Sequence, residues 1–416
     1  MGGFGAGGCV TGRLQADLVT LVSAARWDVV IVGGGASGLL CAIYAGRKGR
    51  RVLVLEQSAK CGLKILVSGG GRCNFTNIWT DPQEHFLSAN AHFCISALRR
   101  YTPEDFIALV EDHDIAYHEK KSGQLFCDGS AKDLLAMLLQ HARNAGVQIK
   151  TRAQVQSVEA ADAGGFEVAA GAHSFFADRV VLASGGLSMP KISSDLAFRM
   201  ARQFGLGLVE TEPALVPLTW NNSDRARFAH LSGLSLPAAV RCGDNAFSED
   251  ILFTHRGLSG PAILQISSYW TPGDSIAIDL LPELDAFEWL VAAQEASPRT
   301  RGSSLLQTRL PKRLVHELSG MWFDDGRLGE VAHRDLRELA NRLHGWVLKP
   351  GGTEGYRTAE VTLGGVATDA VSSKTFEVKQ VPGLYIIGEA LDVTGWLGGF
   401  NFQWAWSSAF CCAEHL

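Results

Sequence analysis

Residues 27–38 read WDVVIVGGGASG, and this stretch decides the fold of the chain. Its first part, 27–32, is a mostly apolar run typical of a buried strand, and a helical stretch follows the glycines over 39–48. A second apolar run ends at Glu56, which lies 18 residues beyond Gly38. A Gly-x-Gly-x-x-Gly turn between a strand and a helix, with an acid at this distance, is typical of a dinucleotide-binding βαβ unit. The pattern predicts an α/β fold with a Rossmann-like nucleotide-binding domain.

Each residue of this turn has a distinct expected role. Gly33 permits the tight turn, Gly35 lets a pyrophosphate approach the backbone, and Gly38 lets the helix pack closely on the strand. The amides at the start of the helix, around Ala36 and Ser37, supply unpaired N–H groups for the phosphates. We therefore expect the turn to hold the pyrophosphate of a dinucleotide.

Glu56 is the expected partner of the adenosine ribose, and Gln57 stands beside it in the same predicted site. A carboxylate at this point accepts hydrogen bonds from both ribose hydroxyls and repels a 2′-phosphate, so FAD or NAD fits better than NADP. The alternative is a glycine-rich turn in some other α/β fold. Strand, turn, helix and acid agree in order and spacing, and together they favour the nucleotide site.

Composition and charge narrow the class of protein. The chain has 416 residues, of which 46% are hydrophobic and 19% charged, as is ordinary for a globular enzyme of two or three domains. The net charge of −5, without an evident basic patch, predicts a small-molecule substrate with no nucleic-acid and no membrane partner. The nine cysteines show no zinc-like or Cys-x-x-Cys spacing, so we expect reduced thiols, no metal and a cytoplasmic protein. Residues 1–26 lack a basic n-region and are expected to form a flexible N-terminal extension.

Two more glycine-rich loops are expected to contact the cofactor. The first combines three glycines with an arginine and two asparagines, which suits a pyrophosphate or a flavin edge; a flexible surface loop is the alternative. The second follows a buried strand over 179–183 and offers another close approach to the backbone. The contacts predicted in these loops are Lys64, Ser68, Gly69, Gly70, Gly71, Arg72, Cys73, Asn74, Ala183 and Gly185.

The end of the chain carries a pattern with which many FAD enzymes complete the flavin site: a strand, an acidic turn and a glycine pair that opens the last helix. Both ends of the sequence would then meet at one cofactor. Asp392 would contact the ribityl chain or the diphosphate, or else is a turn aspartate. Gly399 and Asn401 should face the flavin N1/O2 edge, where a helix N-terminus stabilises the negative charge of reduced flavin. The predicted contacts here are Gly388, Glu389, Asp392, Gly398, Gly399, Phe400 and Asn401.

The middle of the chain is expected to be an insertion. The predicted boundaries are 27–195 and 355–416 for the FAD-binding domain, 196–354 for the insert, and within the insert about 208–281 for a β-rich part and about 283–346 for a helical segment. His255 and Arg256 stand in a conspicuous loop of the insert and are the candidate catalytic residues. They serve either as a substrate-facing acid/base pair or as parts of a domain-packing loop.

Together these motifs resemble those of the BaiN/RdsA-type (YhiN-like) family of NAD(P)/FAD-dependent oxidoreductases. The most specific are the Ser-Gly-Gly-Gly-Arg-Cys-Asn-x-Thr-Asn loop and the Gly-Glu-x-Leu-Asp…Gly-Gly-x-Asn-x-Gln-Trp-Ala ending, and the resemblance covers nearly everything from residue 27 onward. It implies bound FAD, a Rossmann-like domain interrupted by a β-barrel-like insert and a helical segment, and reduction or desaturation of small organic substrates. Related flavoproteins read adenine with main-chain groups of the strand that holds Val155, which adds this residue to the predicted contacts; an ordinary strand residue is the alternative.

We therefore expect an FAD-dependent oxidoreductase that transfers hydride between NAD(P)H and a small, unsaturated organic substrate. A second nucleotide-binding βαβ unit is not evident, so NAD(P)H would dock transiently over the flavin or another donor would serve. Two alternatives stay open: an oxidase or hydroxylase that reacts reduced flavin with O₂, and a flavin-binding redox sensor without turnover. An RNA-modifying flavoprotein is disfavoured because no basic patch is evident.

Overall fold

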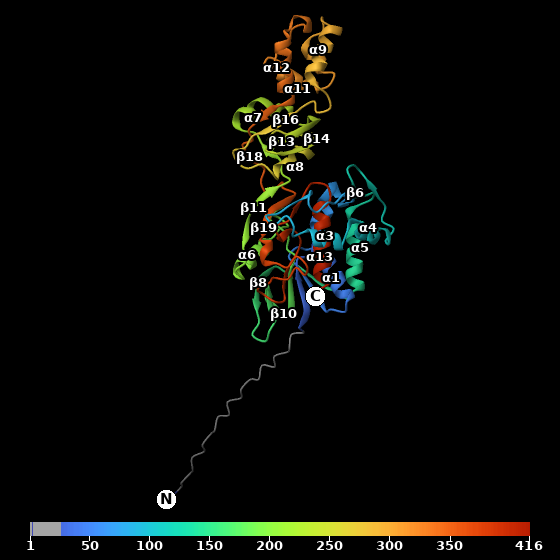
Figure 1. The fold of residues 1–416 in the computed structure, drawn as a ribbon. Helices are drawn as coiled ribbons and strands as arrows, with labels where there is room; N and C mark the ends of the chain where they lie inside the picture. The colour runs from blue at the N-terminus through green and yellow to red at the C-terminus, as the bar shows by residue number, and fades with distance from the viewer. Residues whose placement is uncertain (1, 3–25) are drawn as a thin grey trace.

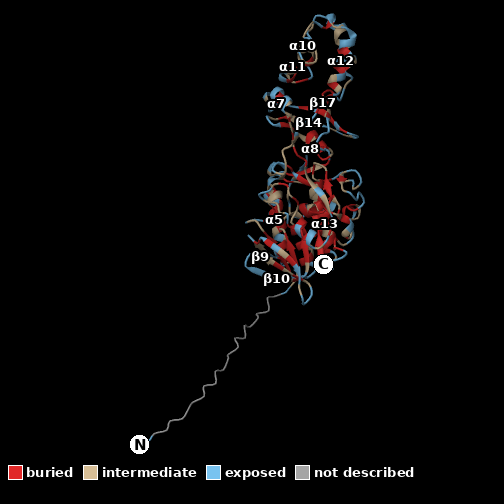
Figure 2. Cartoon of the chain, turned by 90° about the vertical axis from the view of Figure 1, so that its left-hand side faces the viewer, coloured by how far each residue is buried: buried red, intermediate tan, exposed pale blue. Residues whose placement is uncertain are grey.

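The structure is a computed structural model that describes residue 2 and residues 26–416. The predicted N-terminal extension lies outside the described residues, apart from residues 2 and 26. Figure 1 shows two lobes in an elongated arrangement, with a helical tip at the far end of the smaller one. We call residues 26–214 and 361–416 the large lobe and residues 215–360 the insert lobe. Each lobe has its own cluster of buried apolar side chains, which Figure 2 shows at its centre.

A seven-stranded sheet organises the large lobe, in the order β7-β2-β1-β10-β9-β8 with β20 also paired to β10. Strands β7, β2, β1 and β20 and the second half of β10 are parallel, as the βαβ pattern predicts, and Val30 pairs with Leu53 on one side and Val180 on the other. The first half of β10 pairs antiparallel with β9. The strands are β1 (Trp27–Val32), β2 (Val52–Glu56), β7 (Gln148–Thr151), β8 (Val155–Ala160), β9 (Phe166–Ala170), β10 (His173–Leu182) and β20 (Leu384–Ile386).

The first and the last helix of the large lobe lie side by side, so both ends of the described chain meet at one place (Figure 1). Helix α1 also contacts α5, whose N-cap Ser130 accepts a hydrogen bond from the Lys132 N–H at 3.2 Å. In the last helix, the buried indoles of Trp404 and Trp406 donate to main-chain carbonyls at 3.0 and 2.8 Å. The helices are α1 (Ala36–Arg47), α2 (Leu63–Val67), α3 (Ile95–Arg100), α4 (Pro103–Glu111), α5 (Ala131–Asn144), α6 (Leu196–Gln203) and α13 (Phe400–Ala413), with the short 3₁₀ turns η1 (Ser68–Gly71) and η5 (Gly388–Ala390).

The chain enters and leaves the insert lobe through two paired strands, β11 (Leu208–Ala214) and β19 (Val361–Val366), which run antiparallel. The insert lobe is an antiparallel sheet in the order β17-β16-β13-β14-β15-β12-β18, followed outward by a helical tip (Figure 1). Its strands are β12 (Leu218–Thr219), β13 (Ser235–Cys242), β14 (Asn245–Phe253), β15 (Gly257–Ser259), β16 (Ile276–Asp279), β17 (Trp346–Leu348) and β18 (Gly352–Thr353). Its helices are α7 (Asn222–Phe228), α8 (Pro261–Ser267), α9 (Ala286–Ala296), α10 (Gly302–Leu306), α11 (Lys312–Leu318) and α12 (His333–His344).

A small sheet of the large lobe reaches across to the insert lobe. It consists of β3 (Asn74–Asn77), β6 (Gln124–Cys127) and β5 (Tyr117–Glu119). The turn between β5 and β6 carries Lys121, which forms an ion pair with Glu249 on β14. The two lobes are therefore joined by this pair as well as by the β11–β19 connection. None of the helices in the described part of the chain is long and apolar enough to cross a membrane.

Candidate active site

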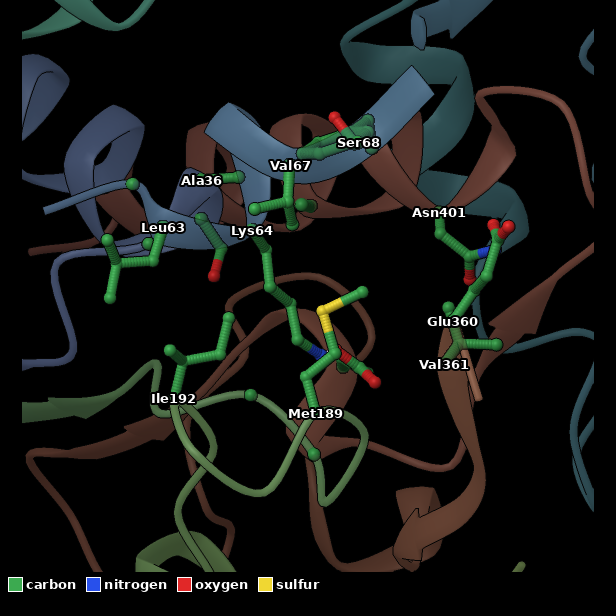
Figure 3. A pocket seen from close by; sticks show the side chains of 18 of the residues that line it. Ala36, Leu63, Lys64, Val67, Ser68, Met189, Ile192, Glu360, Val361 and Asn401 are labelled. Carbon is green, nitrogen blue, oxygen red and sulfur yellow. The ribbon is translucent and has the colours of Figure 1, made fainter. Parts of the chain in front are cut away.

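A cavity of about 900 Å³ lies between the two lobes, at the carboxyl ends of the parallel strands. Open α/β sheets bind their ligands at this edge, and the volume suits a large organic ligand. The large lobe lines the cavity with the β1–α1 turn, α2, the loop after β10 and the start of α13, and the insert lobe adds β14 and α8. Figure 3 shows Lys64, Met189 and Ile192 extending into it.

Most of the predicted cofactor contacts come together at this cavity, although they lie far apart in the sequence. Eighteen line it: Gly33, Gly35, Ala36, Ser37, Glu56, Gln57, Lys64, Ser68, Gly69, Gly70, Asn74, Val155, Ala183, Gly185, Glu389, Gly398, Gly399 and Asn401. Seven do not: Gly38, Gly71, Arg72, Cys73, Gly388, Asp392 and Phe400. The fold thus gathers one site from several loops, while contact of each residue with a cofactor stays a prediction.

The first glycine turn fits the pyrophosphate of a dinucleotide. A Cβ at Gly33, which has φ +111°, would overlap the Ala183 carbonyl group, and a Cβ at Gly38 would overlap the Gly33 carbonyl oxygen. These two glycines therefore fix the turn and the packing of α1. A Cβ at Gly35 would instead enter open space, so a ligand can approach the backbone there. No side chain caps the start of α1, which leaves its first N–H groups for an anion.

Glu56 stands at the end of β2 with its carboxylate held in one orientation. Oε2 accepts the Gly34 N–H at 2.8 Å, and Oε1 accepts the Ser58 N–H at 2.7 Å. A carboxylate has lone pairs beyond these two bonds, so it can still accept from ribose hydroxyls. Gln57 donates to the two carbonyl oxygens of residues 192–193, at 3.3 and 3.0 Å, and so fastens the loop on the far side of the cavity.

Lys64 and Glu389 form an ion pair in the cavity wall, with 2.7 Å between Nζ and Oε2. The same ammonium group donates to Ser188 Oγ at 2.6 Å, and the other carboxylate oxygen accepts the Thr362 N–H at 2.9 Å. The pair joins α2 to the turn after β20. An ammonium group has three N–H donors, so Lys64 keeps one for a cofactor or a substrate.

The second glycine-rich loop presents its backbone to the cavity rather than its most distinctive side chains. Gly69 and Gly70 have φ +55° and +65° and line the cavity. Arg72 is exposed and Cys73 is fully buried, and neither lines the cavity. Burial raises the pKa of the Cys73 thiol to about 12, which leaves it inert. Any support that this loop gives to a cofactor therefore comes from its main chain and from Ser68 and Asn74, which line the cavity, rather than from Arg72 or Cys73.

The turn before α13 is locked by its own side chains. Asn401 accepts the Gly395 N–H at 2.8 Å and donates to the Gly395 carbonyl at 2.7 Å. Gly399 has φ +100°, and a Cβ there would overlap the Thr76 carbonyl group. The amide of Asn401 thus shapes the turn, and the glycine pair and the helix N-terminus are what the turn offers to a ligand.

Three other predicted contacts near the C-terminus serve packing away from the cavity. The buried carboxylate of Asp392 accepts a main-chain N–H of residue 89 at 2.8 Å. Phe400 stacks on His85 with ring centroids 4.4 Å apart. The Gly388 carbonyl accepts the Trp404 indole N–H, which fixes the last helix against the turn after β20.

The structure does not bring His255 and Arg256 to the cavity. Both are exposed in the turn between β14 and β15, and Arg256 lies 3.5 Å from a carboxylate oxygen of Glu354. The polar cavity residues that the sequence analysis missed include Lys120, Lys121, Glu249, Asp250 and Glu360. They lie in no glycine-rich motif, and only the meeting of the two lobes brings them together.

The fold and the cavity define a Rossmann-type flavoprotein in which both ends of the chain shape one dinucleotide site. The family described as HI0933-like protein Rossmann domain matches residues 27–415, and the chain belongs to this family of FAD-dependent oxidoreductases. The ribosomal RNA dihydrouridine synthase of Escherichia coli (strain K12) is 48% identical over 394 residues, covering 94% of this chain and 98% of that protein.

Two further relatives extend this comparison. The ribosomal RNA dihydrouridine synthase of Haemophilus influenzae is 45% identical over 395 residues, covering 92% of this chain and 97% of that protein. The 3-dehydro-bile acid delta(4,6)-reductase of Clostridium scindens is 31% identical over 404 residues, covering 91% of this chain and 96% of that protein. Both matches extend over the two lobes.

These relatives overturn one expectation. We expected no nucleic-acid partner from the net charge of −5 and the lack of an evident basic patch, but two relatives are named for an activity on ribosomal RNA. Net charge is an average over the whole chain, and it hides local clusters. Residues 297–316, in the helical tip, contain five Arg or Lys residues and no Asp or Glu.

Proposed function

We propose that the protein reduces a uridine of ribosomal RNA to dihydrouridine, with FAD as bound cofactor and NAD(P)H as hydride source. The observation that carries this proposal is the 48% identity to the Escherichia coli ribosomal RNA dihydrouridine synthase over 98% of that protein. The more distant relative is named as a bile acid reductase. Reduction of an unsaturated ring is therefore the chemistry that the named activities have in common.

When bound, FAD supplies the redox chemistry, because it takes hydride from a nicotinamide and gives it to an unsaturated carbon. The residues of the chain hold and orient this cofactor. Glu56 accepts from the adenosine ribose, the N-terminus of α1 binds the pyrophosphate, and the turn at Gly398 and Gly399 supports the flavin end. The free N–H of Lys64 is available to the cofactor or to a carbonyl oxygen of the substrate.

The substrate base has to leave the RNA stack, because an enzyme that does chemistry on a base needs access to its faces. The insert lobe completes the cavity with Asp250 and Glu249 on β14, opposite the turn that carries Lys120 and Lys121. The lysines suit the phosphates that flank an extruded nucleotide. This arrangement supports a cavity that takes up the base between the two lobes.

A basic surface on the insert lobe supports the RNA as partner. We call the exposed side chains of Arg225 and Arg227 on α7, with Lys312 and Arg313 on α11, the α7–α11 surface. Glu317 of α11 forms an ion pair with Arg227 at 3.7 Å and offsets part of this charge. The Arg313 guanidinium donates to the His230 carbonyl after α7, so the two helices lie side by side. Lysine and arginine contacts to phosphates position a nucleic acid without reading its sequence. The surface is suited to hold a folded RNA while one base enters the cavity.

The direct test uses the purified, FAD-loaded protein and ribosomal RNA from a strain that lacks its gene, offered free and in ribosomal subunits. Without oxygen, NADH or NADPH should bleach the flavin absorbance, and dihydrouridine should then appear in the digested RNA by mass spectrometry. A flavin that neither nicotinamide bleaches contradicts the NAD(P)H part of the proposal. A reduced protein that leaves every uridine unchanged contradicts the RNA part.

A further inference from the structure

Glu360 places a carboxyl group in the cavity that the binding of FAD proposed above does not use. The residue lies directly before β19, where the chain returns to the large lobe, and its N–H donates to the Leu215 carbonyl at 3.3 Å. Glu360 and Asn401 both line the cavity and are labelled in Figure 3, and Leu397, shortly before α13, packs against the cluster that contains Val361, the neighbour of Glu360. The carboxyl group therefore stands near the turn that we expect to support the flavin end of the cofactor.

Five carboxylate side chains line the cavity, and three of them already have partners. Glu56 accepts two main-chain N–H groups, and Glu389 and Glu249 each pair with a lysine. Within residues 26–416, the carboxylates of Asp250 and Glu360 have neither a hydrogen-bond nor an ion-pair partner. These two groups are available for chemistry on a molecule in the cavity.

Glu360 is exposed to the cavity, and its carboxyl has a raised pKa. The open cavity admits water to the side chain, yet the protein atoms around it desolvate the carboxylate and raise the pKa of Glu360 above its usual value. No charged neighbour contributes to this shift, so no nearby cation holds the group ionised. A ligand that fills the cavity displaces the remaining water, which moves the pKa further in the same direction.

We propose that Glu360 is a catalytic acid, which donates a proton to C5 of the uracil ring as the ring is reduced; this inference rests on the proposed function. The hydride forms a C–H bond at C6, the C5–C6 π bond breaks, and its electron pair takes the proton from the Glu360 carboxyl. The side chain is left as a carboxylate and regains a proton from water when the product leaves. The sum consumes one uridine, one NAD(P)H and one proton, and yields dihydrouridine and NAD(P)⁺.

Other proton donors near the cavity are less well placed for this step. Lys64 donates to Ser188 and Glu389 and keeps its third N–H for a hydrogen bond to the cofactor or to a carbonyl oxygen of the substrate. The thiol of Cys73 does not line the cavity. Asp250 is the remaining unpaired carboxylate, but it comes from the insert strand β14 rather than from the wall beside α13. Asp250 is therefore the competing proton donor against which Glu360 is tested.

The variant Glu360→Gln tests the inference, because an amide has the same size and cannot act as the acid. Reduced, FAD-loaded wild type, E360Q and D250N are mixed with ribosomal RNA, and dihydrouridine is measured in a single turnover. We expect E360Q to be slower by about 100-fold or more, since general acid catalysis contributes that much. D250N also lies in the cavity wall but keeps the acid at position 360, so it should be slowed much less than E360Q. The opposite pattern, or an E360Q variant as fast as wild type, overturns the inference.

Three further readouts separate an acid from a merely structural residue. E360Q should bind FAD and be reduced by NAD(P)H like wild type, and Glu360→Asp should restore part of the rate. The single-turnover rate of wild type should fall as pH rises through the raised pKa of Glu360, because the acid form is lost, and E360Q should not show this fall. Infrared difference spectra should contain a carboxylic acid C=O band in wild type that E360Q lacks.

The outcomes distinguish this inference from the proposed function. A wild-type protein that makes no dihydrouridine refutes the function. In that case the infrared band still decides whether Glu360 carries a proton, and its absence from wild type overturns the inference. A wild-type protein that is active, together with an equally active E360Q, leaves the function standing and removes Glu360 as the acid.

Discussion

The two sides of the cavity are built in different ways. The large lobe contributes the backbone of its glycines, at the β1–α1 turn, in η1 and before α13, and the uncapped N–H groups at the start of α1, together with side chains such as Glu56 and Lys64. The insert lobe and the β19 connection form the other side from charged side chains such as Asp250 and Glu360. A backbone site requires particular residues in a particular order, whereas a side-chain site requires only that separate elements meet. The first kind leaves a pattern in the sequence, and the second does not.

The largest effect should come from adding a methyl group to a glycine of the large lobe, at Gly38 in the β1–α1 turn. Gly38→Ala places a Cβ against the Gly33 carbonyl oxygen, where neither backbone can yield without opening the turn. We expect a loss of stability of about 3 kcal/mol and little bound FAD, measured by denaturant unfolding and flavin absorbance. Gly35→Ala is the control, because its Cβ enters open space: it should unfold like wild type without FAD but bind FAD more weakly. Equal FAD affinity in both variants and wild type would contradict the predicted pyrophosphate site.

Replacing Glu56, the carboxylate expected to bind the adenosine ribose, should have the next largest effect. In Glu56→Gln the amide cannot accept in every direction in which the carboxylate does, and it lacks the charge that strengthens those bonds. Hydrogen bonds to charged groups contribute about 1.5–3 kcal/mol, so the FAD dissociation constant should rise about 10–100-fold in a fluorescence titration. Asp250→Asn removes a carboxylate from the other side of the cavity and should leave FAD affinity unchanged. A loss of affinity in D250N but not in E56Q would reverse the assignment of the two sides.

The contrast between glycine backbone and separate side chains also explains which parts of the fold and the site could be predicted from the sequence. The parallel sheet, the meeting of the two chain ends and eighteen residues of the cavity lining could be predicted, because close approaches such as that of Gly33 to Ala183 permit only glycine. Arg72 and Asp392 share those loops, but the first is exposed and the second is bound to residue 89. A loop sequence does not reveal which way each side chain turns.

The residues that could not be predicted have no motif around them, because only the folded structure brings them together. Glu360 is one ionisable residue before an apolar strand, and only the pairing of β11 with β19 places it in the cavity wall. The α7–α11 surface joins residues 225–227 to 312–313, which are close only in the folded insert lobe. The expectation of no nucleic-acid partner failed in the same way, because a net charge says nothing about where charges gather.

A smaller effect, confined to the insert lobe, should follow from weakening the α7–α11 surface. In the double variant Lys312→Ala with Arg313→Ala, RNA affinity should fall several-fold at low salt. The slope of log K against log salt should become shallower by about 0.7–0.9 for each phosphate that the variant no longer neutralises. Fluorescence anisotropy with a fragment of ribosomal RNA measures both quantities. Arg199→Ala removes an exposed arginine from the large lobe and should change neither. An unchanged slope in the double variant would mean that the RNA does not bind at this surface.

The smallest effect should come from the ion pair that joins the two sides of the cavity. Lys121 and Glu249 are both partly exposed, with 47% and 23% of their side-chain surface accessible, so water screens their attraction. The coupling energy from a double-mutant cycle of Lys121→Ala and Glu249→Ala should be at most about 1 kcal/mol and should shrink in high salt. The lobes should stay joined by β11 and β19, and FAD affinity should not change in either variant. A coupling of several kcal/mol that persists in salt would show that the pair is desolvated. In that case the two sides of the cavity would act as one rigid unit. They would then differ only in how readily each side can be predicted from the sequence.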